Sequence, residues 1–436
     1  MRGAQKVGFF VALPWYLQNR VLRAILIVAS FAGISVGLVI PFLTLTARER
    51  GISLGAIGIM ASSYLVAQML LQLPLGALSD RVGRVGPLAV GLLVEALATA
   101  SFTFADSAPT FILARVGQGV GVAILYPSFR AMIADVTPAN RRGQAYAVVG
   151  AAFSGGMLFG PPIGGMVATI VGVNWLFLTA GGLEVIVAFS TLFTMRRLVP
   201  REHVTEEKAR VPFRELISRP LAGAFILGFA GQFQFGLFSG IWSIYLKDLS
   251  ASDFQIGLSF STFSVTFMLL APFMGRLADH SERWRRILVA NLLYAVVIAL
   301  YGLIENVPFI LVLGLVEGAI VSFTQPVADA YLASIADPRV QGRVQGAYVT
   351  IGMAGAAISA LLGSVLYGIA PVVPFLVGGA VMAALTVVAV YFVRETEQRM
   401  TLSQTTHRRD PGDQPPLGAN EAPLTAAGSH STTDLP

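Results

Sequence analysis

Long apolar runs separated by short polar clusters form the main pattern along the chain. A helix needs ~20 consecutive apolar residues to cross a hydrocarbon core of ~30 Å, and twelve runs come close to this length or exceed it. A polar stretch divides the runs into two sets of six. The pattern therefore predicts an all-α membrane protein. The predicted spans lie near residues 22–45, 55–79, 86–105, 109–133, 144–171, 174–195, 221–246, 254–278, 287–304, 308–335, 344–370 and 372–393.

The two sets of six spans define the predicted domain organisation. We expect an interfacial segment at 1–20, a six-helix half at 21–196, a cytoplasmic linker at 197–220 and a second six-helix half at 221–395. Residues 396–436 are rich in Pro, Gly, Thr and Ser, and we expect a disordered cytoplasmic tail there.

Composition changes the picture by excluding other classes of protein. Of 436 residues, 55% are hydrophobic and only 12% are charged. An ordinary soluble domain is about 25% charged, so this chain has too little charge to cover a water-facing surface. It has no cysteine, which excludes a disulfide scaffold and any site that depends on a thiol.

The basic residues are sorted by loop. The termini, the even-numbered loops and the central linker hold 25 of the 30 Lys and Arg residues, and the odd-numbered loops hold three. The other two, Arg115 and Arg130, lie within spans. Because cytoplasmic loops carry excess Lys and Arg, we expect both termini in the cytoplasm of a multi-pass protein in the cell (inner or plasma) membrane. The net charge of +6 therefore reflects orientation, and we expect no nucleic-acid partner.

The two halves contain an internal duplication. Five residues of the first half recur 199 positions later in the second. An even number of spans per half makes the copies parallel repeats, which meet at a central cleft that opens to one side at a time. The matched pairs are Gly58 and Gly257, Gly76 and Gly275, Leu78 and Leu277, Asp80 and Asp279, and Pro127 and Pro326.

The loop between spans 2 and 3 carries the most specific motif. It reads Gly76-Ala-Leu78-Ser-Asp80-Arg81-Val-Gly83-Arg84. This resembles the signature loop of the major facilitator superfamily (MFS), and the match is complete at the signature positions. The resemblance covers about residues 20–395. It implies the MFS fold: twelve transmembrane helices in two pseudo-symmetric halves.

The resemblance also implies a gating latch that holds the outward-facing state. Its residues would be Gly76, Asp80, Arg81, Gly83 and Arg84, with Asp135 at the end of span 4. Arg84 can bridge two carboxylates, and Asp135 is the candidate second one. The alternative is a solvated turn with cytoplasmic arginines. The copy in the second half, residues 275–283, is degraded and lacks the second glycine.

Span 4 contains a buried charge within a second motif. The sequence from Arg115 to Gly119 resembles the family's arginine-x-x-glutamine-glycine motif, which is linked there to proton coupling. An arginine deep in a span costs ~2.5–3.5 kcal/mol on insertion scales, so it is rarely without a role. The alternative is a structural pair with Glu95 that holds spans 3 and 4 together.

Span 5 resembles the motif of the drug:proton antiporter branch. The motif residues are Gly156, Gly160, Pro161, Gly164 and Gly165. Glycines four residues apart give a smooth face for close helix packing, and the proline bends the helix. Ala147 replaces one further glycine of the longer family form. The motif favours export, and ordinary helix packing is the alternative.

Few ionisable residues lie inside spans, and the family's arrangement ranks them. In the family, spans 1, 4, 7 and 10 line the cavity and spans 3, 6, 9 and 12 lie outside it. This favours Arg115, Glu317 and Asp329 over Glu95 and Glu184 for proton coupling. A carboxyl group in an apolar cavity favours its protonated form and can carry a proton. Glu317 is the first candidate and Asp329 the second, with structural pairing as the alternative for each.

Aromatic and amide side chains on the cavity-lining spans suggest a site for an apolar or amphipathic organic molecule. A sugar carrier could use the same residues, and plain packing is the alternative for each one. The candidates are Gln118 and Tyr126 on span 4, Gln232, Phe233, Gln234, Phe235, Trp242 and Tyr245 on span 7, and Gln325 on span 10.

No catalytic set appears in the sequence. The four histidines lie in loops or the tail, and none of the three lysines follows a glycine as a P-loop requires. We expect no enzyme activity, no cofactor, no metal and a monomer in the lipid bilayer. The expected function is a proton-coupled exporter (antiporter) that works by alternating access. The alternatives are a proton-coupled importer (symporter) of a sugar or similar nutrient, and a non-transporting membrane sensor or scaffold.

Overall fold

The computed structural model describes residues 14–138, 141–198, 218–277, 283–336 and 341–409, and it is helical throughout its regular elements. Within these residues, twelve helices are long and apolar enough to cross a membrane, which confirms the twelve predicted spans. The first six are α2 (Arg20–Glu49), α3 (Leu54–Val82), α4 (Val85–Ser101), α5 (Ala108–Asp135), α6 (Arg142–Val171) and α7 (Val173–Leu198). The second six are α8 (Arg219–Asp248), α9 (Asp253–Leu277), α10 (Arg283–Leu303), α11 (Val307–Ile335), α12 (Gln341–Tyr367) and α13 (Val373–Arg409).

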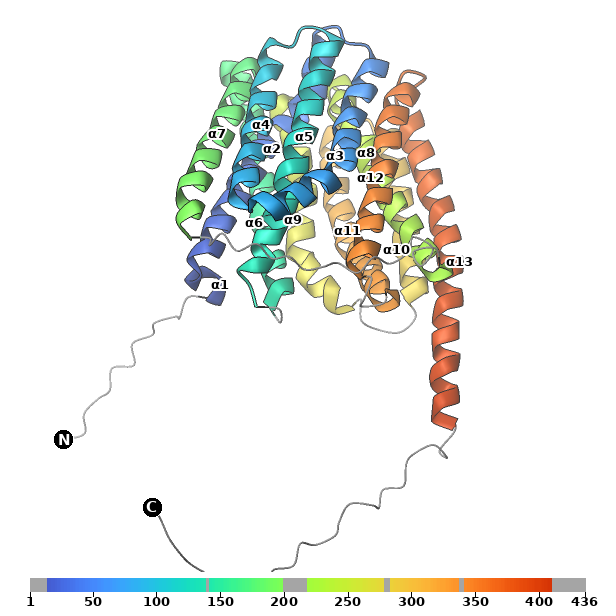
Figure 1. Cartoon of the computed structure of the whole chain (residues 1–436). Helices are drawn as coiled ribbons and strands as arrows, with labels where there is room; N and C mark the ends of the chain where they lie inside the picture. The colour runs from blue at the N-terminus through green and yellow to red at the C-terminus, as the bar shows by residue number, and fades with distance from the viewer. Residues whose placement is uncertain (1–13, 139–140, 199–217, 278–282, 337–340, 410–436) are drawn as a thin grey trace, which may run out of the picture.

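The C-terminal end of the chain differs from the sequence prediction, and the N-terminal segment is described only in part. A short helix α1 (Trp15–Gln18) precedes α2, and residues 1–13 of the predicted interfacial segment lie outside the described residues. α13 continues to Arg409 and extends beyond the bundle in Figure 1, so 396–409 is helical where we expected a disordered tail. Apolarity ends with the span, but Glu, Gln, Arg and Met continue a helix well in water. Residues 410–436 of the predicted tail, and 199–217 of the predicted linker, lie outside the described part.

The helices pack in the same pattern in both halves. α2 packs on α6 as α8 packs on α12, and α3 packs on α5 as α9 packs on α11. The halves meet through α6 against α9 and through α12 against α3, which are again equivalent pairs. α1 and the end of α13 lie at the same end of the bundle (Figure 1). We call this the terminal end, and the other the opposite end.

Equivalent glycines lie at the two contacts between the halves. A Cβ on Gly58 of α3 would be 3.0 Å from the carbonyl oxygen of Leu361 on α12. A Cβ on Gly257 of α9 would collide with the carbonyl oxygen of Pro161 on α6. The duplication seen in the sequence therefore places the same small residue at the same point of both interfaces.

The glycine motif of α6 has two faces. On one face, a Cβ on Gly160 or Gly164 would be 2.6 Å from the carbonyl oxygen of Ile34 or Leu38 on α2. On the other, a Cβ on Gly165 would be 2.6 Å from the carbonyl oxygen of Asp253, where α9 begins. The first face holds α6 within its own half, and the second meets the other half.

The halves are joined at the opposite end of the bundle. Arg48 at the end of α2 forms a 2.8 Å ion pair with Asp248 at the end of α8. The Tyr367 hydroxyl of α12 donates to the same Asp248 oxygen at 2.8 Å. Buried apolar residues from both halves form one core cluster beneath this pair, including Phe42 and Ile241. The structure is therefore closed at the opposite end.

Candidate functional site

A cavity of about 690 Å³ lies between the two halves and is lined by residues from all twelve long helices. Sites for small organic molecules commonly have volumes of ~300–1,000 Å³. The cavity therefore has room for a drug-sized molecule. Its two walls come from different halves of the chain, and they differ in chemistry.

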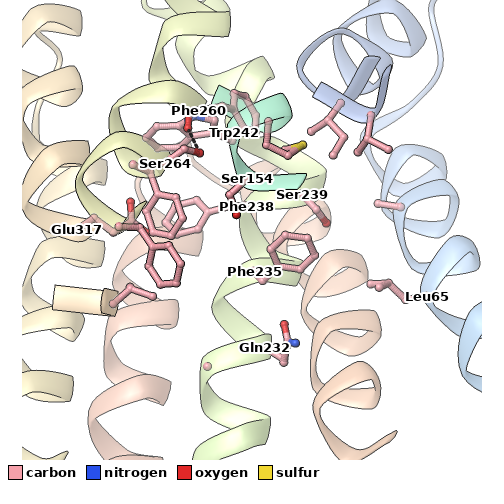
Figure 2. Close-up of a pocket in the computed structure, with 18 of the residues that line it drawn as sticks. Leu65, Ser154, Gln232, Phe235, Phe238, Ser239, Trp242, Phe260, Ser264 and Glu317 are labelled. Carbon is pink, nitrogen blue, oxygen red and sulfur yellow. Dashed lines mark hydrogen bonds between the residues drawn. The ribbon is translucent and has the colours of Figure 1, made fainter. Parts of the chain in front are cut away.

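The wall from the C-terminal half is mainly aromatic. Gln232, Phe235, Ser239 and Trp242 lie at successive turns of α8 and line the cavity (Figure 2). Trp242 donates its indole N–H to the Ser259 hydroxyl at 2.9 Å, which fixes the ring. Around it, the rings of Phe238, Tyr301 and Phe375 lie 4.8–6.3 Å from that of Trp242. This wall offers flat apolar surface with a few amide and hydroxyl groups.

Glu317 of α11 is the acidic group of this wall. Tyr301 donates its hydroxyl to Oε2 at 2.8 Å, and Tyr294 donates to Oε1 at 3.2 Å. Both tyrosines come from α10 and are buried. Each carboxylate oxygen therefore has one neutral donor, and among the described residues no lysine or arginine forms an ion pair with Glu317.

The wall from the N-terminal half carries a polar cluster. Arg115 donates to the Oε1 atom of Gln118 at 2.7 Å, and its guanidinium lies 4.5 Å from the ring centroid of Tyr64. Gln118 in turn donates from Nε2 to the Thr99 hydroxyl at 2.9 Å. These residues line the cavity, as do Ser35, Glu95 and Glu184.

The positions of Glu95 and Glu184 correct the sequence analysis. We expected spans 3 and 6 to keep these acids outside the cavity, yet both line it. The family's division into cavity-lining and outer spans describes the positions of the helix axes. A glutamate side chain, however, places its carboxyl group several bonds away from its own helix backbone. The helices also approach closely, since a Cβ on Gly121 of α5 would be 2.8 Å from the backbone nitrogen of Glu95. The polar cluster also contains Ser35, Tyr64 and Thr99. The sequence analysis did not single them out, because these side chains are uncharged.

Arg115 and Glu95 both face the cavity, as the pairing alternative requires. The two side chains interact electrostatically. They form no direct ion pair in the described structure, and the hydrogen bond of Arg115 goes to Gln118. The electrostatic contact therefore does not replace a functional role for Arg115.

The predicted substrate residues separate into two groups. Gln118, Gln232, Trp242 and Gln325 line the cavity. Gln234 instead points away from it, is fully buried and donates to the Gly378 carbonyl oxygen of α13 at 2.7 Å. On an α-helix, residues 232 and 234 lie on different faces, because two residues turn the chain by ~200°.

Two further predicted residues lie off the cavity. Tyr126 is 37% exposed and accepts a hydrogen bond from Arg130 at 3.3 Å. Asp329 is not among the lining residues, although its neighbour Ala328 is. Arg130 and Asp329 occupy equivalent positions of the two repeats, 199 residues apart, which makes them a candidate pair. The two do not pair in the described structure, and Arg130 instead lies over the rings of Tyr126 and Tyr146.

The loop motif contains the predicted contact between its basic and acidic residues. Arg84 donates from Nε to Asp135 Oδ2 at 3.2 Å, and both belong to the N-terminal half. Gly83 ends α3 with a φ of 92°, which favours glycine. A Cβ on Gly76 would be 3.2 Å from the Pro127 side chain, so Gly76 allows α3 and α5 to approach closely. Arg81 is exposed, and the side chain of Asp80 lies outside the described part of the structure.

Comparison with known proteins finds relatives that are named as drug-resistance or drug-efflux proteins. The multidrug resistance protein 2 of Bacillus subtilis is 24% identical over 361 residues, 80% of this chain and 90% of its own. The multi-drug resistance efflux pump PmrA of Streptococcus pneumoniae is 28% identical over 295 residues, 65% of this chain and 72% of its own. The class H tetracycline resistance protein of Pasteurella multocida is 24% identical over 404 residues, 88% of this chain and 99% of its own.

A solved structure shares the fold. The human organic anion transporter MFSD10 superposes with a TM-score of 0.63 at 18% identity, covering 87% of this chain and all of that one. A family model described as Major Facilitator Superfamily matches residues 25–245 and 224–428, and so covers both halves. With twelve membrane-spanning helices and a cavity between two repeated halves, the chain belongs to the major facilitator superfamily of membrane transporters.

Proposed function

We propose that this protein is a proton-coupled exporter of an apolar or amphipathic organic compound. One observation carries the proposal: the carboxyl group of Glu317 lines the same cavity as an aromatic wall able to hold such a compound. A proton and an organic molecule can then use one cavity in turn. Export is favoured by the antiporter motif of α6 and by the relatives, which are named as efflux pumps or resistance proteins.

The coupling follows from competition inside the cavity. With Glu317 protonated, the wall around Trp242 and Phe235 is uncharged and the carboxyl group can donate a hydrogen bond. With Glu317 ionised, its charge is held by the two tyrosine hydroxyls and favours a substrate that carries positive charge or donates hydrogen bonds. Proton uptake therefore weakens substrate binding, and substrate binding releases the proton.

The orientation fits export by alternating access. We place both termini in the cytoplasm of the cell membrane, on the basis of the 25-to-3 division of basic residues. The opposite end, closed by Arg48 and Asp248, would then face the outside. In this arrangement the substrate would enter from the cytoplasmic side and leave after the pair between the halves separates. We propose that a monomer carries out the cycle, because each chain contains both walls.

The loop motif would act when the halves change position. Arg84 and Asp135 hold the end of α5 to the loop after α3. We propose that this group stabilises the state open to the outside, with Asp80 and Arg81 as further members. Gly76 and Gly83 would set the backbone that brings them together.

Everted membrane vesicles from an expressing strain test the function. We expect tetracycline, a quinolone or ethidium, added one at a time to energised vesicles, to release protons from the vesicle interior. Proton movement in the direction of the substrate would instead indicate a symporter of a nutrient. The absence of proton movement over the whole panel, with the protein present in the membrane, would favour a sensor or scaffold.

A further inference from the structure

We propose that Glu95 and Glu184 share a second proton-binding site in the N-terminal half of the cavity, with Arg115 as its counter-charge. The inference rests on the proposed function in one respect, because the second proton would move in the same transport cycle as that of Glu317. The site itself is argued from the geometry of the N-terminal wall.

The two acids are buried and close enough to influence each other. Glu95 comes from α4 and Glu184 from α7, and their exposed fractions are only 8% and 3%. Both line the cavity, and α4 and α7 approach closely beside them, since a Cβ on Gly181 would be 2.8 Å from the carbonyl oxygen of Ala96. Two carboxyl groups in one buried site do not ionise independently, and they bind protons as a pair.

The charges around the pair balance only when one proton is bound. Among the described residues, the titratable and charged groups that face it are Tyr64 from α3 and Arg115 from α5, and α2 contributes the neutral hydroxyl of Ser35. Two carboxylates and one guanidinium leave one negative charge in a low-dielectric cavity. One proton on either acid makes the cluster neutral. The step requires no other reactant: the proton is taken from water on one side and returned to water on the other.

The hydrogen bonds leave atoms available for this exchange. Glu184 accepts from the Ser35 hydroxyl on Oε1 at 2.6 Å, while its buried Oε2 has no hydrogen-bond partner in the described structure. The buried Nε atom of Arg115 also has none. The Oε2 atom of Glu184, which has no donor, can carry the bound proton. When that proton leaves, the N–H at Nε of Arg115 can interact with the carboxylate that remains.

The duplication supports the site independently of its charges. With the repeat offset of 199, Glu95 corresponds to Tyr294 and Gln118 to Glu317. In the C-terminal half, α10 supplies the phenol and α11 the acid. In the N-terminal half, α4 supplies the acid and α5 the amide. In each repeat, one of these two positions therefore holds a cavity-lining acid, Glu95 on α4 in the first half and Glu317 on α11 in the second.

Infrared difference spectroscopy of the purified protein in lipid tests the site without a substrate. Titration with acid should show the carbonyl stretch of two separate protonated carboxyl groups. E317Q should remove one and keep the other. E95Q and E184Q should each shift or remove the second, and E305Q, at an exposed residue between α10 and α11, should change neither. If E317Q shows no remaining band, or if the double variant E95Q/E184Q keeps the second band, the proposal is wrong.

A transport measurement separates this proposal from the proposed function. With ethidium, a monovalent cation, exchange for two protons moves net charge and exchange for one proton does not. In proteoliposomes, wild-type exchange should respond to membrane potential, and E184Q exchange should become insensitive to it. If wild type shows no exchange for any compound while the second infrared band is present, the proposed function fails and the site stands. If wild type exchanges one proton per ethidium, the second proton does not travel.

Discussion

The two walls of the cavity hold an acid between the membrane-spanning helices in different ways. On the C-terminal wall, Glu317 is held by two neutral tyrosine hydroxyls. On the N-terminal wall, Arg115 and Glu184 both act electrostatically on Glu95. Both walls derive from one repeated arrangement of helices. The difference shows that duplication preserved the places where polar groups can lie and let their charges diverge.

This contrast has an energetic meaning. Neutral donors stabilise a carboxylate only through hydrogen bonds, so Glu317 can gain or lose a proton without disturbing another charge. An arginine neutralises one carboxylate at all times, so the N-terminal wall is sensitive to any change in the charge of its members. We expect substitutions on the first wall to alter coupling, and substitutions on the second to alter coupling and stability together.

The largest expected effect comes from removing the acid of the C-terminal wall. E317Q keeps the shape of the side chain and removes the proton site, so we expect proton-driven export to fall by at least about tenfold, the equivalent of ~1.4 kcal/mol. The measurement is substrate-driven proton release in everted vesicles at matched expression. E305Q is the control, because Glu305 is exposed and lies outside the cavity. Undiminished release by E317Q would remove Glu317 from the coupling mechanism.

The two tyrosines provide a finer test of how Glu317 is held. A hydrogen bond to a charged group contributes ~1.5–3 kcal/mol. Tyr301 donates at 2.8 Å and Tyr294 at 3.2 Å, so we expect Y301F to shift the pH dependence of export more than Y294F. Losing a donor to the ionised form should move the transition to higher pH. Equal, unshifted profiles for both variants would show that the hydroxyls do not hold the carboxylate.

The glycine pair Gly37 and Gly236, also 199 positions apart, compares the packing behind the two walls. A Cβ on Gly236 would collide with the Ala356 carbonyl oxygen, whereas one on Gly37 would be 2.8 Å from the Pro161 side chain. Overpacking costs ~1–3 kcal/mol, and we expect G236A to lower the melting temperature more than G37A. Gly155, with open space around its Cβ direction, supplies the control G155A. A melting temperature for G236A equal to that of G155A contradicts this packing.

The smallest expected effect is at the opposite end, where the walls are held together. Arg48 and Asp248 are both 38% exposed, and exposed ion pairs contribute ~0–1 kcal/mol. R48Q should increase, by up to about fivefold, the rate at which a thiol reagent labels a cysteine introduced beneath the pair. K247Q breaks the Lys247–Asp253 pair within one half and is the matched control. Equal labelling of both variants would exclude Arg48 from closure.

The sequence allowed the spans, the duplication and the contact of Arg84 with Asp135 to be predicted, because each depends on local composition or on a specific motif. It did not allow Glu95 and Glu184 to be placed in the cavity, since whether a long side chain passes between two helices depends on how closely they pack. The prediction that Gln234 lines the cavity was wrong for a related reason. Composition identified α8 as a helix with several amide side chains, but the rotation of the helix about its axis decides which amide faces the cavity. The end of α13 was missed because the apolar run ends before the helix does.

The two faces of α6 separate two properties of the transporter. Gly160 and Gly164 fix the helix to α2, so changes there should alter how many molecules reach the membrane correctly assembled. Gly165 meets α9 at a contact between the halves, which must move during transport, so changes there should alter how often each molecule completes a cycle. Gly164 and Gly165 are adjacent, so correct assembly and the rate of transport depend on neighbouring residues of one helix. Evolution can therefore change either property while the other stays constant.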